Sequence, residues 1–192
     1  MHAGECPDWK FGTVENARYA VEELGAARVG HGLALGRHLD LARLYALLRK
    51  PTVEVGEYIK LGIFCIFFTS NPMYIQVCLT SNVARGYKVP SYAEHPVRAF
   101  YECGLPFSLS CDNLLLSGDD PAVPPTPAGE ILHLVYDVFH GDEAKGWSAV
   151  RESLRAGVEA RFTRKEDDKW GKEFMREVDA VFEKHGMVFP LI

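Results

Sequence analysis

The chain has 192 residues, of which 47% are hydrophobic and 24% charged, and its formal net charge is −5. This composition is typical of a globular domain with one sizeable core. No basic stripe is visible, which argues against nucleic acid as a partner. The longest apolar run is residues 61–68. A membrane-spanning helix needs about 20 apolar residues, so we predict no membrane span.

The five cysteines are an odd number, and no two of them have the spacing of a zinc ribbon. Polar and charged residues begin at once at the N-terminus, which is unlike a secretory signal. Reduced thiols and a cytoplasmic location are the simplest interpretation of this pattern.

The first predicted elements alternate between helix and strand. Residues 13–24 have the apolar spacing of a helix, which Gly25 is placed to end. Residues 27–32 then form a short predicted strand that runs into a glycine-flanked turn. A second helix is predicted over residues 37–49, where Pro51 stops it.

The alternation continues through the middle of the chain. Residues 52–55 are predicted as strand, and residues 78–82 as the polar end of a strand. A helix over residues 96–103 leads to a buried strand over residues 105–112 that ends on a carboxylate. Further helices are predicted over residues 131–139, 147–162 and 169–182. Alternating strands and helices, with polar residues at the strand ends, indicate an α/β fold with a parallel sheet.

Four polar clusters mark these strand ends and a nearby helix start. They are His2-Ala3-Gly4-Glu5, Gly30-His31-Gly32, Thr80-Ser81-Asn82 with His95-Pro96 after it, and Asp112-Asn113. Their order and spacing resemble the adenosine deaminase family, which shows HAGE, GHG, a CPTSN-like strand end, HP and a DD pair in this order. The resemblance runs from His2 to about Lys169.

The resemblance implies the C-terminal portion of a (β/α)₈ TIM-type barrel, with about three parallel strands plus helices. Such a barrel typically needs about 250 residues. The family's HxH pair on the first strand has no counterpart in this sequence. We therefore expect residues 1–192 to be a partial domain whose N-terminal half is missing, and a chain that supplies this half is an expected partner.

The resemblance also assigns roles to individual residues. It makes His2 a zinc ligand, and Asp112 both a zinc ligand and a partner of the reacting water. Glu5 presents a proton to the purine ring nitrogen beside the reacting carbon. His31 orients and polarises the water on the zinc. Asn113 stands where the family usually has a second aspartate that contacts the base.

These residue types suit the chemistry. Zinc accepts imidazole and carboxylate ligands and lowers the pKa of bound water from 15.7 to about 7. A glutamic acid with a raised pKa can protonate the ring nitrogen. An asparagine amide at position 113 donates a hydrogen bond without any change of pKa, unlike the family's aspartate, so the substrate preference is left open.

Each cluster also has a plain structural interpretation when it is taken alone. A histidine between glycines, such as His31, is more often a residue of a turn than a catalytic group. Ser81-Asn82 alone is more often a turn or a helix cap, and Asp112-Asn113 alone is typical of an Asx-turn. The order of all four clusters is what favours the functional interpretation.

Residues 55–76 are predicted to be an insertion. Deleting these 22 residues joins Thr52-Val53-Glu54 to Val77-Cys78 as one continuous strand. Gly56-Glu57-Tyr58 can be encoded by a typical splice donor, and Gln76 by a typical acceptor, so we hypothesise a retained intron. The alternative is a genuine loop or an extra strand over residues 61–68.

The function implied by the resemblance is zinc-dependent hydrolytic deamination of adenosine or a related adenine nucleoside or nucleotide, with release of ammonia. Adenine, adenosine monophosphate and a methylated adenine nucleotide are alternative substrates. Two other hypotheses stay open. One is a non-catalytic half-barrel, or pseudo-enzyme fragment, that binds a purine or a partner chain. The other is a gene-model fragment that is untranslated or rapidly degraded.

Overall fold

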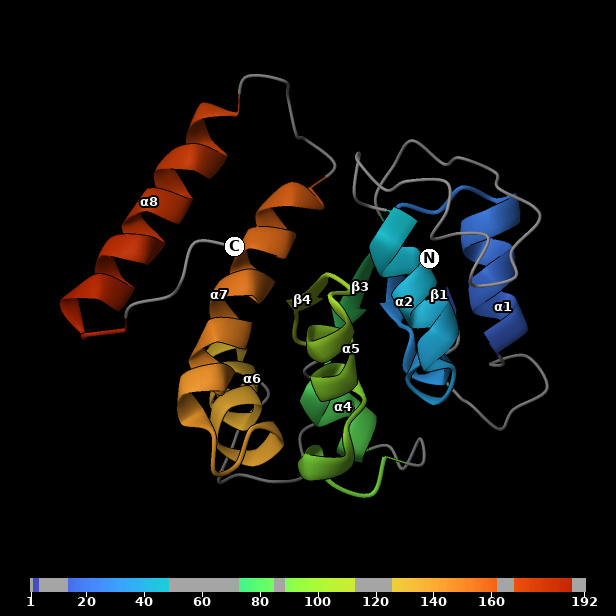
Figure 1. Cartoon of the computed structure of the whole chain (residues 1–192), viewed down its shortest axis with the longest axis horizontal. Helices are drawn as coiled ribbons and strands as arrows, with labels where there is room; N and C mark the ends of the chain where they lie inside the picture. The colour runs from blue at the N-terminus through green and yellow to red at the C-terminus, as the bar shows by residue number, and fades with distance from the viewer. Residues whose placement is uncertain are drawn as a thin grey trace.

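A parallel sheet forms the centre of the molecule in the computed structural model (Figure 1). The structure describes residues 2–3, 14–48, 73–84, 89–112, 126–161 and 168–187. The strands are β1 (His2–Ala3), β2 (Arg28–His31), β3 (Tyr74–Val77) and β4 (Phe107–Leu109). Their order in the sheet is β1-β2-β3-β4, and every neighbouring pair is parallel. Strands that are adjacent in sequence are thus adjacent in space, as in a β/α repeat.

Helices connect successive strands. Between β1 and β2 lie α1 (Val14–Arg18) and the π-helix η1 (Tyr19–Glu23). Between β2 and β3 lie the 3₁₀ helix η2 (Leu33–Arg37) and α2 (Leu39–Leu48). Between β3 and β4 lie α4 (Leu79–Ala84), the 3₁₀ turn η3 (Tyr92–Glu94) and α5 (Val97–Cys103).

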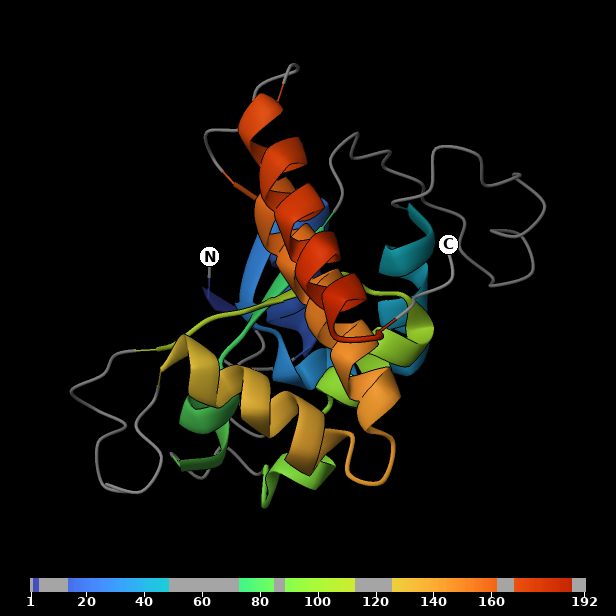
Figure 2. The same ribbon diagram turned by 90° about the vertical axis from the view of Figure 1, so that its left-hand side faces the viewer.

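In the described part of the chain, four helical segments follow β4. They are α6 (Pro127–Leu132), the π-helix η4 (His133–Val138), α7 (Glu143–Glu159) and α8 (Lys169–Lys184). Side chains cap the first turns of three of them, with Thr126, Asp142 and Asp168 each accepting a backbone N–H. Figures 1 and 2 show α8 lying along α7 on the outside of the molecule.

The core lies against the middle strands. Ile75 and Val77 of β3 are buried, as are Phe100 of α5 and Leu134 and Phe139 beyond α6. These side chains belong to one buried hydrophobic cluster, which joins β3 to α5 and to the helices after β4. Among the described residues, no helix is long and apolar enough to cross a membrane.

The predicted fold class is confirmed, since the described strands form an open parallel sheet with helices, as a partial barrel does. Two details differ. A two-residue strand at His2–Ala3 adds a fourth strand to the three expected. Residues 79–82, predicted as the end of a strand, instead belong to the helix α4. The reason is that the Glu130 carboxylate accepts the N–H groups of Leu79 and Thr80, which lets the chain turn into a helix directly after β3.

The predicted insertion lies partly in the described sheet. Residues 74–76 belong to β3, where the Tyr74 hydroxyl donates to Glu159 at 3.0 Å and the Gln76 amide donates to Ser110 at 3.0 Å. Residues 55–72, and the strand predicted over residues 52–55, lie outside the described residues. The retained-intron hypothesis therefore stays a prediction.

Candidate active site at the carboxyl ends of the strands

The strand register places the polar clusters at one edge of the sheet. Gly30 of β2 is level with His2 of β1 on one side and with Gln76 of β3 on the other. Gln76 is in turn level with Ser108 of β4. The end of β2 and the residues that follow β3 and β4 therefore lie at the same edge of the sheet. They are His31, the helix α4 and the segment up to Asp112. Active sites of α/β barrels are built at this carboxyl edge.

His31 ends β2 in a strained backbone conformation. Its φ is 65°, and Gly32 follows with φ 59°. A Cβ at Gly32 would lie 3.0 Å from Cδ1 of Ile75, so position 32 needs glycine both for conformation and for space. A non-glycine residue in the left-handed region marks a place where the surroundings over-determine the backbone. Here the turn bends the chain sharply at the point where the His31 side chain enters the site.

Two neighbouring residues of α4 hold the two predicted catalytic side chains that the structure describes. Nδ2 of Asn82 lies 2.9 Å from Nδ1 of His31. The Ser81 hydroxyl donates to Oδ2 of Asp112 at 2.6 Å. Because α4 starts directly after β3, it stands between the ends of β2 and β4 and reaches both. Sequence analysis placed Ser81 and Asn82 in the motif but gave neither a role.

His95 extends this arrangement from the other side of Asn82. Its Nε2 lies 3.1 Å from Oδ1 of Asn82, and its Nδ1 accepts the backbone N–H of Val97 at 3.1 Å. Burial, together with the proximity of His31, lowers the pKa of His95 to about 3. The imidazole is therefore neutral at physiological pH.

Glu130 is a functional residue of the site that sequence analysis missed. Its buried carboxylate accepts the N–H of Leu79 at 2.6 Å and that of Thr80 at 3.2 Å, across some fifty positions of sequence. The positive end of a helix dipole suits a carboxylate, although burial raises the Glu130 pKa above its usual value. Glu130 thus fixes the start of α4. The signal was an acidic residue at the head of an apolar helical stretch.

The other predicted site residues are described only in part. The backbone of His2 lies in β1 and is level with Gly30. Glu5 and Asn113 lie outside the described residues. Within the described ranges, no group of three or more His, Cys, Asp or Glu side chains is arranged to hold a metal. A catalytic zinc uses at least three protein ligands, so His2 and Asp112 are donors of a suitable type that do not complete a site by themselves.

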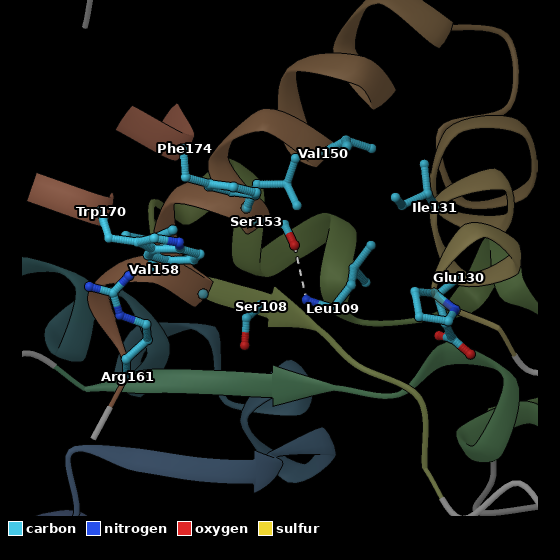
Figure 3. Close-up of a pocket in the computed structure, with 13 residues that line it drawn as sticks. Ser108, Leu109, Glu130, Ile131, Val150, Ser153, Val158, Arg161, Trp170 and Phe174 are labelled. Carbon is cyan, nitrogen blue, oxygen red and sulfur yellow. Dashed lines mark hydrogen bonds between the residues drawn. The ribbon is translucent and has the colours of Figure 1, made fainter. Parts of the chain in front are cut away.

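Two cavities lie near the site without including its predicted catalytic side chains. One, of about 250 Å³, opens between β4, α6, α7 and α8, with Trp170 and Phe174 of α8 on one side and Ile131 of α6 on the other (Figure 3). The second, of about 330 Å³, lies beside His95. Neither is lined by His31 or Asp112.

Comparison with solved structures supports the class of fold. The crystal structure of an amidohydrolase from Burkhoderia ambifaria, with bound Zn, superposes with a TM-score of 0.56 at 18% sequence identity. The match covers 95% of this chain and 42% of that chain. This likeness shows that the two chains share a fold.

Comparison of sequences identifies the family. The adenosine deaminase family model matches residues 1–123. The adenosine deaminase of Clostridium kluyveri is 26% identical over 183 residues, which cover 94% of this chain and 41% of that protein. That of Vibrio vulnificus is 32% identical over 117 residues, or 61% of this chain and 27% of that protein. The chain belongs to the adenosine deaminase family, and it spans less than half the length of these relatives.

Proposed function

We propose that this chain supplies the C-terminal part of a zinc-dependent hydrolase that deaminates adenosine or a related adenine nucleoside or nucleotide. Family membership supports the reaction class. The observation that carries the proposal is the pairing of His31 with Asn82 and of Asp112 with Ser81, because successive residues of one short helix orient both catalytic candidates.

The chain's own residues divide the chemistry between them. Asp112, oriented by Ser81, accepts a proton from the attacking water, and His31 donates a hydrogen bond to the water oxygen. Glu5 protonates the ring nitrogen beside the carbon that carries the amino group, so that attack on this carbon leaves no negative charge in the ring. The carbon–nitrogen bond then breaks, the amino group takes up a proton and leaves as ammonia, and the ring keeps the oxygen.

Zinc, when bound, supplies a Lewis acid that makes water nucleophilic near neutral pH. We propose His2 and Asp112 as two of its ligands. The remaining ligands belong to the proposed N-terminal half, since a catalytic zinc needs at least three. That half would also pair with the edge strands β1 and β4 of the described sheet.

An ammonia-release assay tests this proposal. The 192-residue chain is assayed alone and after co-expression with a segment that supplies an HxH strand, with zinc and with adenosine, adenine or adenosine monophosphate. We expect ammonia only from the combined protein, and most from a nucleoside or nucleotide. A folded, zinc-loaded combined protein that releases no ammonia from any of these substrates would refute the proposed reaction.

A second candidate function is a non-catalytic half-barrel that binds a purine or a partner chain. The observation that favours it is that the described sheet is open and ends in the edge strands β1 and β4, where a partner chain can pair. Isothermal titration calorimetry of the combined protein, with zinc and with adenosine, separates the two candidates. Adenosine binding that is unchanged by zinc and unaffected by Asp112→Ala favours the half-barrel, whereas binding that needs both favours the enzyme.

A further inference from the structure

Three buried side chains form a continuous hydrogen-bonded chain that ends at the predicted catalytic histidine. His31, Asn82 and His95 are 2%, 0% and 2% exposed, respectively. They come from the end of β2, from α4 and from the segment that precedes α5. Each contact is between 2.9 and 3.1 Å long. Buried polar groups are normally satisfied in this way, and a satisfied network has one consistent set of donors and acceptors.

The backbone N–H of Val97 determines which atoms donate and which accept in this hydrogen-bond network. A backbone N–H can only donate, so Nδ1 of His95, which lies 3.1 Å away, is an acceptor and carries no proton. A neutral imidazole has a single proton, which must then be on Nε2. This Nε2–H donates to the Asn82 side chain at 3.1 Å, so the Asn82 atom that faces it is the carbonyl oxygen.

The orientation of the Asn82 amide in turn determines which nitrogen of His31 accepts a hydrogen bond. With its oxygen turned toward His95, the amide presents its NH₂ group to Nδ1 of His31 at 2.9 Å. Nδ1 of His31 therefore accepts, and its proton is on Nε2. The flipped amide would set two donors, the NH₂ group and the Nε2–H of His95, against each other in a buried site, which is unfavourable.

We infer that Asn82 and His95 are positioning residues that hold His31 as its Nε2–H tautomer, so that it serves the reaction as a hydrogen-bond donor and not as a general base. The inference rests on the proposed function for its catalytic meaning, but the tautomer itself is a property of the fold. It follows that the proton of the attacking water goes to Asp112.

Gly36 contributes to this arrangement through packing. A Cβ at Gly36 would overlap with Cβ of Pro96, the residue after His95. The close approach of η2 to the start of α5 thus depends on a glycine. This packing holds the backbone at Pro96, next to His95, in place. The hydrogen-bonded chain is therefore anchored at both ends, by the turn at His31 and by this contact.

Histidine ¹⁵N NMR on the full 192-residue chain tests the inference directly. Long-range ¹H–¹⁵N correlation spectra show which ring nitrogen carries the proton, and loss of a signal in His31→Gln assigns His31. We expect both His31 and His95 to be Nε2–H tautomers in the unsubstituted chain. A proton on Nδ1 of His31, or rapid exchange between its tautomers, would overturn the inference.

Asn82→Asp is the sharpest variant, because it keeps the shape of the side chain and replaces the donor by an acceptor. We expect the proton of His31 to move to Nδ1 or the ring to become doubly protonated. Gln76→Glu makes the same chemical change beside Ser110 and is expected to leave His31 unchanged. A tautomer that stays on Nε2 in a folded Asn82→Asp chain would contradict the proposed direction of the network.

A pair of substitutions at His95 provides an independent test should Asn82→Asp fail to fold. His95→Gln keeps a side-chain donor for Asn82 and is expected to keep the Nε2–H tautomer of His31. His95→Leu removes the donor and is expected to produce a mixture of tautomers. Identical His31 spectra in the two variants would refute the role of His95.

Activity gives a separate readout. In a preparation that releases ammonia, a wrong His31 tautomer is expected to lower kcat by about 10²- to 10⁴-fold with little change in KM, as for other histidines whose tautomer matters. The NMR result decides the tautomer even when no ammonia is released, so failure of this inference and failure of the proposed function are distinguishable.

Discussion

Oγ of Ser81 lies 2.6 Å from Oδ2 of Asp112, which joins α4 to the segment after β4 across 31 positions of sequence. The next residue along, Asn82, contacts His31 at the end of β2. One short helix thus contacts the residues at the ends of β2 and β4, the two strands on either side of β3. Its own start is held by Glu130 from α6, so the geometry of the site depends on a residue far from the motifs.

Ser81→Ala tests the contact with Asp112. Because the acceptor is a carboxylate, we expect the free energy of unfolding to fall by about 1.5–3 kcal/mol, as measured by urea denaturation. Ser91→Ala is the matched control, since the Ser91 hydroxyl donates at 3.1 Å to the carboxylate of Glu94 in an exposed pair. An equal loss of stability in the two variants would show that the Ser81–Asp112 contact stabilises the fold no more than an exposed pair does.

Glu130→Ala tests the cap on α4. Two buried N–H groups lose their acceptor, which is expected to lower the free energy of unfolding by about 2–4 kcal/mol. Glu130→Gln keeps an acceptor oxygen and should lose less. Glu143→Ala, at an exposed position in the first turn of α7, is the control and should change stability by less than about 0.5 kcal/mol. A larger loss in Glu143→Ala than in Glu130→Ala would contradict this account.

His95 gives the folded chain a predictable dependence on pH. Its folded-state pKa is about 3, below the ordinary 6.5, because of burial and the proximity of His31. The unfolded chain therefore binds a proton more readily, and the stability that is present above pH 6.5 is lost as the pH falls toward 3. At pH 5 the loss relative to pH 8 is about 2 kcal/mol from this group.

His95→Gln should remove that part of the pH dependence, which chemical denaturation at a series of pH values measures. The charged residues that line the cavity beside His95 are Arg37, Glu94, Arg98 and Glu102, and they are the same in both proteins. Parallel stability curves for the variant and the unsubstituted chain between pH 8 and pH 5 would show that His95 is not buried as a neutral group.

Gly32→Ala tests the turn at the end of β2. The left-handed backbone costs a non-glycine residue about 1–2 kcal/mol, and the added Cβ would also press on Ile75. Gly104→Ala is the control, because Gly104 has φ 77° but no atom within 4 Å of the added Cβ. We expect Gly32→Ala to be the more destabilising in thermal unfolding. Equal shifts of Tm would mean that the Ile75 side chain moves away from the added Cβ with no loss of stability.

Deletion of residues 55–76 tests the predicted insertion. It would bring Thr52, Val53 and Glu54 to the β3 positions of Tyr74, Ile75 and Gln76. Val53 is apolar and β-branched, like the buried Ile75 it would replace, so we expect the shortened chain to fold and to be at least as soluble. Soluble yield and circular dichroism measure this. An unfolded shortened chain, beside a folded full one, would show residues 55–76 to be a genuine part of the fold.

Local signals in the sequence were enough for much of this fold. The helix predicted over residues 96–103 is confirmed as α5, which ends at Cys103 with Gly104 as its cap at φ 77°. Apolar spacing likewise predicted the helices that are now described as α7 and α8. These features depend on residues a few positions apart, which a linear reading can detect.

Contacts between residues far apart in the sequence could not be predicted from such local patterns. The helix α4 was predicted as the end of a strand because the Glu130 cap comes from some fifty residues away. The link between His31 and Asn82 spans 51 positions, and periodicity carries no information on such pairs. Motif order indicated that His31 and Asp112 share a site, but the side chains that orient them emerged only from the folded geometry.

Ammonia release from adenosine by the chain together with its proposed N-terminal half, compared with the same protein carrying Asp112→Asn, tests the central claim most directly. Asparagine keeps the shape of the side chain but accepts no proton. We predict zinc-dependent release by the unsubstituted protein and a loss of at least about 10²-fold in kcat for Asp112→Asn. Equal rates for the two folded, zinc-loaded proteins would contradict the role of Asp112 and, with it, the proposed site.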